Sequence, residues 1–157
     1  MTADLLIRGA RISDGTGLPA YTGDVEVRDG RITRVGRLSD ASATVEIDAD
    51  GLDLTPGFVD VHTHYDAQLH FEPSASPSSW HGVTTVLTGN CGFTLAPSKP
   101  EDLDWLVLML AKVEGMSADA LRAGVSFTGG TLGQFLDGLE GRIGVNMACY
   151  VGHAAVR

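Results

Sequence analysis

Long apolar runs and cysteines are scarce in this sequence. The longest uninterrupted apolar run, residues 105–111, is far below the roughly 18 residues needed to cross a bilayer, so we expect no transmembrane helix. The first residues lack a basic region followed by an apolar stretch and a cleavage site, so we expect no secretory signal. Two cysteines, Cys91 and Cys149, are too few for a disulfide framework and favour a reducing compartment, the cytoplasm.

Basic residues are also in the minority. The chain has 157 residues and carries 11 Lys and Arg against 20 Asp and Glu, for a net charge of -9, and its positive residues form no stripe. This charge balance argues against nucleic acid and anionic membrane as partners. A hydrophobic content of 43% with 20% charged residues is typical of a folded globular protein rather than a disordered one.

The first part of the chain has the pattern of short strands separated by turns. Residues 24–28 alternate with period two, and residues 31–35 form another short run. Asp29-Gly30 between them indicates a two-residue hairpin turn with positive φ. Because no helical apolar period occurs before residue 55, we predict that residues 1–54 form a small β-rich N-terminal domain, antiparallel and β-sandwich-like.

From residue 55 onward the pattern changes to continuous apolar runs. Residues 58–61, 83–87 and 143–151 read as buried parallel strands. Between the second and third runs, proline and acidic residues at 100–104 begin a helix that continues to residue 114, and a second short helix is expected at 132–139. This order predicts an α/β fold in which the N-terminal domain is followed by a TIM-like (β/α) barrel.

The predicted barrel is incomplete in this chain. A complete eight-unit barrel takes about 250 residues, whereas residues 55–157 supply only about three strands. An open fragment of this kind would leave an unpaired strand edge and an apolar face exposed. We therefore expect residues 55–157 to be a partial barrel that needs more protein: a C-terminal barrel portion or a second chain.

Two histidines directly follow the first apolar run of this barrel. His62 and His64 are two residues apart, so on an extended backbone their side chains project to the same side. At the C-terminal end of a barrel strand, two neutral imidazoles suit zinc or a related divalent metal. The alternative is that the two histidines lie together on a loop by chance.

A cysteine follows the second run. Cys91 lies between Gly89 and Gly92, which permit tight turning of the backbone at the same rim as the histidines. Its thiolate there would complete a mixed site of histidine and cysteine ligands. Taken alone, a free cysteine is more often a buried small apolar side chain, and the residues by themselves favour that interpretation.

The remaining candidate residues have weaker patterns. His153 ends the third run and is interpreted as a structural residue or an outer partner of a ligand, while Cys149 is interpreted as core. His70 and His81 have no convincing partner in the sequence. Asp66 could orient a histidine or hold a loop, and the pattern leaves both alternatives open.

The residues from Thr55 to His64, Thr-Pro-Gly-Phe-Val-Asp-Val-His-Thr-His, resemble the amidohydrolase superfamily. Within it, the chain is similar to the N-acyl-D-amino-acid deacylase (D-aminoacylase) family over nearly its whole length. The Asn-Cys-Gly-Phe block is far more specific than His-x-His. The narrower resemblance rests on five blocks: residues 64–68 (His-Tyr-Asp-Ala-Gln), 82–86 (Gly-Val-Thr-Thr-Val), 89–93 (Gly-Asn-Cys-Gly-Phe), 113–116 (Val-Glu-Gly-Met) and 151–153 (Val-Gly-His).

The resemblance implies a zinc-dependent barrel that hydrolyses N-acyl-D-amino acids to a carboxylate and a free D-amino acid. His62, His64 and Cys91 match the family's metal-ligand positions, which reverses the interpretation of Cys91 as core. The family's further histidine ligands and catalytic aspartate lie on later strands, so no catalytic residue is assigned here and the chain alone is expected to be inactive. Ala154, where glycine is expected, and residues 125–129, which lack a tryptophan-rich stretch, depart from the family pattern.

Two other functions stay open at this point. A cyclic-amide hydrolase of the dihydroorotase or hydantoinase type shares the His-x-His strand, although Tyr65-Asp66 and the block around Cys91 argue against it. The other alternative is a non-catalytic chain whose β domain and barrel edge bind a partner polypeptide.

Overall fold

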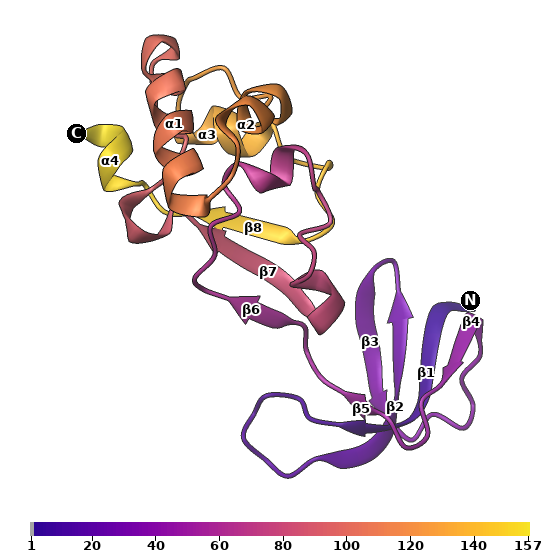
Figure 1. Cartoon of the computed structure of the whole chain (residues 1–157). Coiled ribbons are helices and arrows are strands. Elements are labelled where there is room, and N and C mark those ends of the chain that lie inside the picture. Colours follow the sequence, from indigo (N-terminus) through magenta and orange to yellow (C-terminus); the bar gives the residue numbers. More distant parts are fainter. Residues whose placement is uncertain (1) are drawn as a thin grey trace. The chain divides into compact units, whose positions relative to one another are not determined.

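The structure is a computed structural model that describes residues 2–157. The chain divides into two compact units, one ending at Pro56 and the other spanning Gly57–Arg157 (Figure 1). This boundary lies close to residue 54, where the sequence pattern changes from short strands to longer apolar runs.

The N-terminal unit is a five-stranded sheet. Its strands lie in the order β3-β2-β1-β4, with β5 also paired to β1. The β2–β3 hairpin turns at Asp29 and Gly30, whose φ values are 49° and 68°, as those two residues predict. β1 pairs antiparallel with β2 but parallel with β4 and β5, so the sheet is mixed rather than wholly antiparallel. The strands are β1 (Ala3–Ile12), β2 (Tyr21–Arg28), β3 (Arg31–Gly36), β4 (Ala43–Asp48) and β5 (Asp53–Leu54).

One face of this sheet is made of aliphatic side chains. Directly paired residues project to the same face, and the register aligns two aliphatic positions on each of the four long strands. On the outer strands these side chains are exposed: Ile32 is 68% and Val45 is 53% accessible to solvent. The eight residues of this face are Leu5, Ile7, Val25, Val27, Ile32, Val35, Val45 and Ile47.

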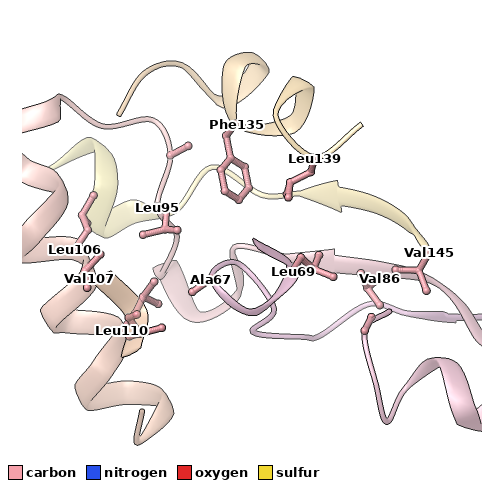
Figure 2. Packing of buried hydrophobic residues seen from close by; sticks show 13 residues of the cluster. Ala67, Leu69, Val86, Leu95, Leu106, Val107, Leu110, Phe135, Leu139 and Val145 are labelled. Carbon is pink, nitrogen blue, oxygen red and sulfur yellow. The ribbon is translucent and has the colours of Figure 1, made fainter. Parts of the chain in front are cut away.

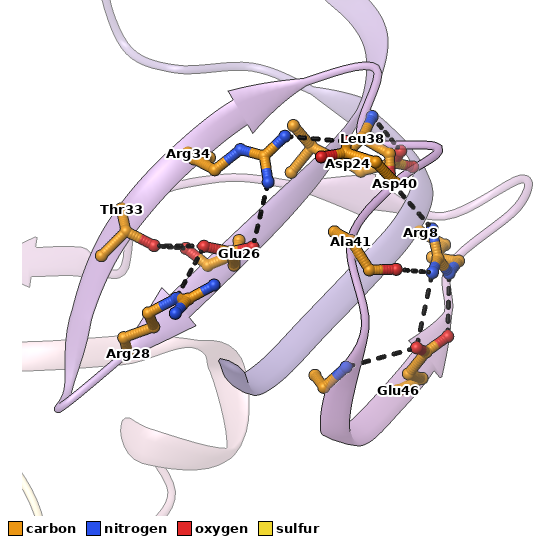
Figure 3. Close-up of polar contacts among 11 residues, drawn as sticks. Arg8, Asp24, Glu26, Arg28, Thr33, Arg34, Leu38, Asp40, Ala41 and Glu46 are labelled. Carbon is orange, nitrogen blue, oxygen red and sulfur yellow. Dashed lines mark hydrogen bonds and ion pairs between the residues drawn. The ribbon is translucent and has the colours of Figure 1, made fainter. Parts of the chain in front are cut away.

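The opposite face carries an ionic network around a buried carboxylate (Figure 3). Glu26 is 1% exposed. It accepts hydrogen bonds from Arg28 Nε at 3.0 Å and from Thr33 Oγ1 at 2.9 Å. Arg34 Nη1 lies 3.5 Å from the second carboxylate oxygen of Glu26. The bonds from Arg28 and Thr33 hold the pKa of Glu26 below its usual range, against the effect of desolvation. A paired carboxylate can therefore remain charged inside this unit.

The second unit is built on three parallel strands, β6 (Phe58–Asp60), β7 (Val83–Thr88) and β8 (Asn146–Cys149), in the order β6-β7-β8. The parallel arrangement confirms the prediction from the apolar runs. The prediction of burial was wrong for the first run, in which Phe58 is 56%, Val59 57% and Val61 60% exposed, and for the end of the third run, in which Tyr150 is 50% and Val151 56% exposed. The reason is that β6 and β8 are the edge strands of this sheet, each with a neighbouring strand on only one side among the residues described, whereas β7 lies between them.

Helices pack against this sheet. α1 and α3 confirm the predicted helices, and Thr131 and Gln134 form a capping box at the start of α3. Two helices were not predicted, α2 and the four-residue α4; α2 begins after Ser117, whose hydroxyl caps it. The helices are α1 (Leu103–Glu114), α2 (Ala118–Gly124), α3 (Leu132–Asp137) and α4 (His153–Val156), with 3-10 turns η1 (Gln68–His70), η2 (Ser79–His81), η3 (Asn90–Gly92) and η4 (Pro100–Asp102).

The core of the second unit lies between the helices and β7 (Figure 2). Leu106, Val107 and Leu110 of α1 are at most 4% exposed, and Phe135 of α3 and Val86 of β7 are fully buried. This core fixes α1 relative to the strands, and therefore also fixes where the C-terminal end of α1 lies. No helix among residues 2–157 is long and apolar enough to span a membrane.

The core predicts a large difference between two leucines of the same helix. Leu110 is 2% exposed and Leu108 is 44% exposed. We expect Leu110→Ala to lower the free energy of unfolding by about 2–5 kcal/mol, because it leaves a cavity, and Leu108→Ala to lower it by less than about 1 kcal/mol. Urea unfolding followed by the helical signal in circular dichroism measures both, since all α-helices of the described residues lie in this unit. Equal losses would contradict this packing.

The ionic network predicts a pH-dependent stability. Because the pKa of Glu26 is lower in the folded chain, its pairing stabilises the fold above the unfolded pKa of about 4.3, and this contribution is lost as the pH falls through the folded value. We expect Glu26→Gln to lower the thermal midpoint at pH 7, and the difference from wild type to shrink in acid. Circular dichroism melts between pH 7 and pH 3 test this. The exposed Glu101→Gln is the control, and a pH-independent difference would contradict the account.

Candidate metal centre

The segment after β6 presents two histidines side by side. The backbone amide of His62 donates a hydrogen bond to Asp60 Oδ1 at 3.1 Å, which stabilises the turn that follows β6. Between the histidines, Thr63 donates both its amide, at 3.0 Å, and its hydroxyl, at 2.8 Å, to the carbonyl of Leu87 in β7. Because Thr63 is buried against β7, the residues on either side of it project together, with ring centroids 5.5 Å apart.

The segment after β7 places the cysteine by an unusual backbone conformation. Cys91 has a φ of 55°, in the left-handed region that non-glycine residues rarely adopt. Gly89, with a φ of 76°, precedes it, and a Cβ there would lie 2.3 Å from the carbonyl oxygen of Tyr150. Only glycine fits this close approach. A strained non-glycine residue that the surrounding structure holds in place is a frequent feature of functional sites.

Hydrogen bonds of two side chains, Asn90 and Asp66, join the histidine segment to the cysteine segment. The side-chain amide of Asn90 donates to the carbonyl of Thr63 at 3.1 Å and to that of Leu87 at 2.8 Å. Asp66, which is 1% exposed, accepts a bond from the amide of Gly89 at 3.2 Å. Desolvation raises the pKa of Asp66, and the bond from Gly89 opposes this rise. The sequence left open whether Asp66 orients a histidine or holds a loop. Its hydrogen bond with Gly89 supports the second role.

The three predicted side chains are brought together. Cys91 Sγ lies 3.4 Å from His62 Nε2, and the nearest ligand atoms of His62, His64 and Cys91 all lie within 4.8 Å of one another. Ligand atoms bound to one tetrahedral zinc are roughly 3.5 Å apart, given bond lengths of about 2.0–2.3 Å. Side-chain adjustments on the order of 1 Å would therefore bring all three onto one ion. Two imidazoles and a thiolate are a donor set that suits zinc.

The other candidates lie outside this group. His153, in α4, is exposed and is not among the clustered ligands. The sulfur of Cys149 lies 3.7 Å from Thr94 Oγ1 and 4.0 Å from Asp66 Oδ1, and burial raises the pKa of its thiol. His70 Nδ1 contacts Ser126 Oγ at 2.9 Å.

Glu114 also lies at the site, although its role was not predicted from the sequence. Its Oε1 lies 3.3 Å from His64 Nδ1, and the two side chains are 18% and 26% exposed. Burial raises the pKa of Glu114, His64 opposes that rise, and Asp66 adds to it. The only signal in the sequence was the Val-Glu-Gly-Met block, which carries a resemblance but no spacing that relates it to His64.

The arrangement leaves room for a further ligand. His62 and Cys91 are exposed, whereas His64 is partly buried, so the three would supply three of the four ligands of a tetrahedral zinc ion.

Comparison with known proteins shows which family the chain is similar to. The model of the amidohydrolase family matches residues 45–156. A D-aminoacylase from Alcaligenes xylosoxydans xylosoxydans is 38% identical over 159 residues, which cover 98% of this chain and 30% of the relative. An N-acyl-D-aspartate deacylase from the same organism is 48% identical over 108 residues, which cover 66% of this chain and 22% of the relative.

A solved structure extends the likeness to three dimensions. The N-acyl-D-glutamate deacylase of Bordetella bronchiseptica, complexed with zinc and a phosphonate that mimics the tetrahedral intermediate, has a TM-score of 0.77 at 34% identity. The match covers 99% of this chain and 31% of that one, so the chain spans less than a third of the length of these relatives. The family model covers most of the chain and the D-aminoacylase matches nearly all of it, so the chain belongs to the amidohydrolase family.

Proposed function

We propose that this chain is the N-terminal part of a metal-dependent amidohydrolase that hydrolyses N-acyl-D-amino acids to a carboxylate and a free D-amino acid. The observation that carries the proposal is the convergence of His62, His64 and Cys91 at the C-terminal ends of β6 and β7. The substrate class follows from the relatives, which are named as deacylases of D-amino acids and match nearly the whole chain or two thirds of it.

The ion that fits the site best is zinc. The mixed imidazole and thiolate donors favour it, and the related N-acyl-D-glutamate deacylase was solved with zinc. When bound, zinc would polarise an amide carbonyl and would make water nucleophilic at neutral pH. A reducing compartment such as the cytoplasm would keep the thiol of Cys91 available as a ligand.

The chain's own residues hold the ligands and keep the site accessible. Thr63 and Asn90 tie the histidine and cysteine segments to β7, so the ligand positions are set before an ion binds. The exposure of His62 and Cys91 lets a small acylated amino acid approach the ion. We assign no general base within residues 2–157, and the proposal therefore needs one from further protein.

The open strand edges indicate what this further protein contacts. Val59 on β6 and Val151 after β8 are 57% and 56% exposed, and unpaired edges with exposed apolar side chains are unfavourable in water. We infer that a C-terminal barrel portion, as a continuation of the polypeptide or as a second chain, pairs with these edges. A non-catalytic chain that binds a partner polypeptide could use the same edges. Metal binding by His62, His64 and Cys91 distinguishes the amidohydrolase from this alternative.

Zinc binding is the first test. We expect the purified chain to retain one zinc ion through dialysis and both His62→Ala and Cys91→Ala to weaken binding by more than the roughly 10- to 100-fold that the loss of an outer partner costs. His81→Ala is the matched control, because His81 lies in η2, outside the cluster. Atomic absorption after dialysis gives the stoichiometry. Zinc that is held equally by all four proteins would contradict the proposed site.

Activity is the second test. We expect no appreciable hydrolysis of N-acetyl-D-amino acids by the chain alone with zinc, because the remaining strands and the base are missing. Release of the free amino acid, followed by a ninhydrin assay, measures this. Robust turnover that disappears in His62→Ala would show that the chain is sufficient for catalysis and would contradict our account of its incompleteness.

A further inference from the structure

His64 has two ring nitrogens, and the structure places them in different surroundings. Nδ1 is shielded from solvent and faces Glu114 Oε1 at 3.3 Å. Nε2 is therefore the nitrogen that remains for the cluster with His62 and Cys91. A neutral imidazole binds a metal through the nitrogen that carries no proton, and the other nitrogen then needs an acceptor for its N–H.

We propose that Glu114 is a positioning residue of the metal centre: its carboxylate holds the Nδ1–H of His64 and so directs the Nε2 lone pair toward the cation. The inference rests on the proposed metal centre and deepens it. It gives a role to the Val-Glu-Gly-Met block, which the proposed function alone leaves unexplained.

Each of the two facing atoms needs a hydrogen-bond partner. Within the described part of the chain, neither His64 Nδ1 nor Glu114 Oε1 has an aligned hydrogen bond, although both are shielded from water. Leaving two such buried polar atoms unpaired is costly. They lie 3.3 Å apart, so a small rotation of the ring or the carboxylate forms the bond and satisfies both.

The position of Glu114 is unfavourable for a carboxylate without such a partner. Glu114 is the last residue of α1, and Gly115, with a φ of 65°, ends the helix. The carbonyl groups at a helix C-terminus repel negative charge, and the side chain is only 18% exposed. Asp66 adds a second acidic group nearby, whereas His64 is the group that attracts. Stability alone would not favour glutamate here.

The hydrophobic core directs the side chain of Glu114 toward the site. Leu106, Val107 and Leu110 form the buried face of α1. Glu114 follows Leu110 by four residues and Val107 by seven, so it lies on the same face of the helix. The packing that buries the leucines therefore also carries Glu114 inward, to His64.

The neighbouring acid does not compete for the role. Asp66 Oδ2 accepts the amide of Gly89 at 3.2 Å, and Oδ1 lies 4.0 Å from the sulfur of Cys149. Its carboxylate is thus engaged with the cysteine segment and with β8. Glu114 is the carboxylate that has an oxygen free for His64.

The direct test is the tautomer of His64 in the metal-free chain, read from the ring nitrogens by ¹⁵N NMR at a pH where imidazoles are neutral. We expect wild type to hold the Nδ1–H form, Glu114→Gln to keep it in part because the amide oxygen still accepts, and Glu114→Met to lose the preference because no acceptor remains. Glu101→Gln, an exposed acid just before the other end of α1, removes the same charge and is expected to change nothing.

Zinc affinity gives the second readout. In competition with a chromophoric chelator, Glu114→Met is expected to weaken zinc binding by roughly 10- to 100-fold, Glu114→Gln by less, and Glu101→Gln not at all. Amide NMR spectra check that each variant folds. Should Glu114→Met fail to fold, Glu114→Asp replaces it: retracting the carboxylate by one methylene is expected to lose the tautomer preference as well.

Each outcome decides between the two proposals. The same tautomer population in wild type and in Glu114→Met, or in Glu114→Asp if that variant is used, would overturn the positioning role, whatever zinc does. A wild-type chain that binds no zinc, but whose His64 tautomer depends on Glu114, would overturn the proposed metal centre and leave the contact between the two side chains intact.

Discussion

The site depends on the parallel pairing of β6 and β7. Because the two strands run in the same direction and are hydrogen-bonded neighbours, the segments that follow them leave the same edge of the sheet. Thr63 and Asn90 then tie these segments together through the carbonyl of Leu87. Two imidazoles and a thiolate that are 29 residues apart at most in the sequence thereby come within 4.8 Å of one another.

The sequence predicted the parts of the site that local spacing controls. His62 and His64 alternate on one strand end, and Cys91 ends the next run, so their common edge follows from the period of a strand and the rule for parallel sheets. The direction of the Cys91 side chain depends on two further features: the left-handed backbone of Cys91 and the close approach of Gly89 to Tyr150. The second feature joins residues that are far apart in the sequence, so local spacing does not predict it.

Glu114 could not be found from the sequence for a related reason. It lies 50 residues after His64, and only the packing of Leu106, Val107 and Leu110 against the sheet brings the end of α1 to the site. The parallel pairing of β4 with β1 was missed because it depends on the path of a loop. The exposure of β6 was missed because continuous apolar runs are typical of strands covered on both sides, whereas here its outer edge is open.

The identity of the metal's ligands tests the central claim most directly. X-ray absorption at the zinc edge of the loaded chain reports the atoms around the ion. The account predicts one sulfur at about 2.3 Å with nitrogen neighbours at about 2.0–2.1 Å, and loss of the sulfur in Cys91→Ser. A shell of nitrogen and oxygen alone in the wild-type chain would show that the thiolate does not meet the histidines at a shared ion.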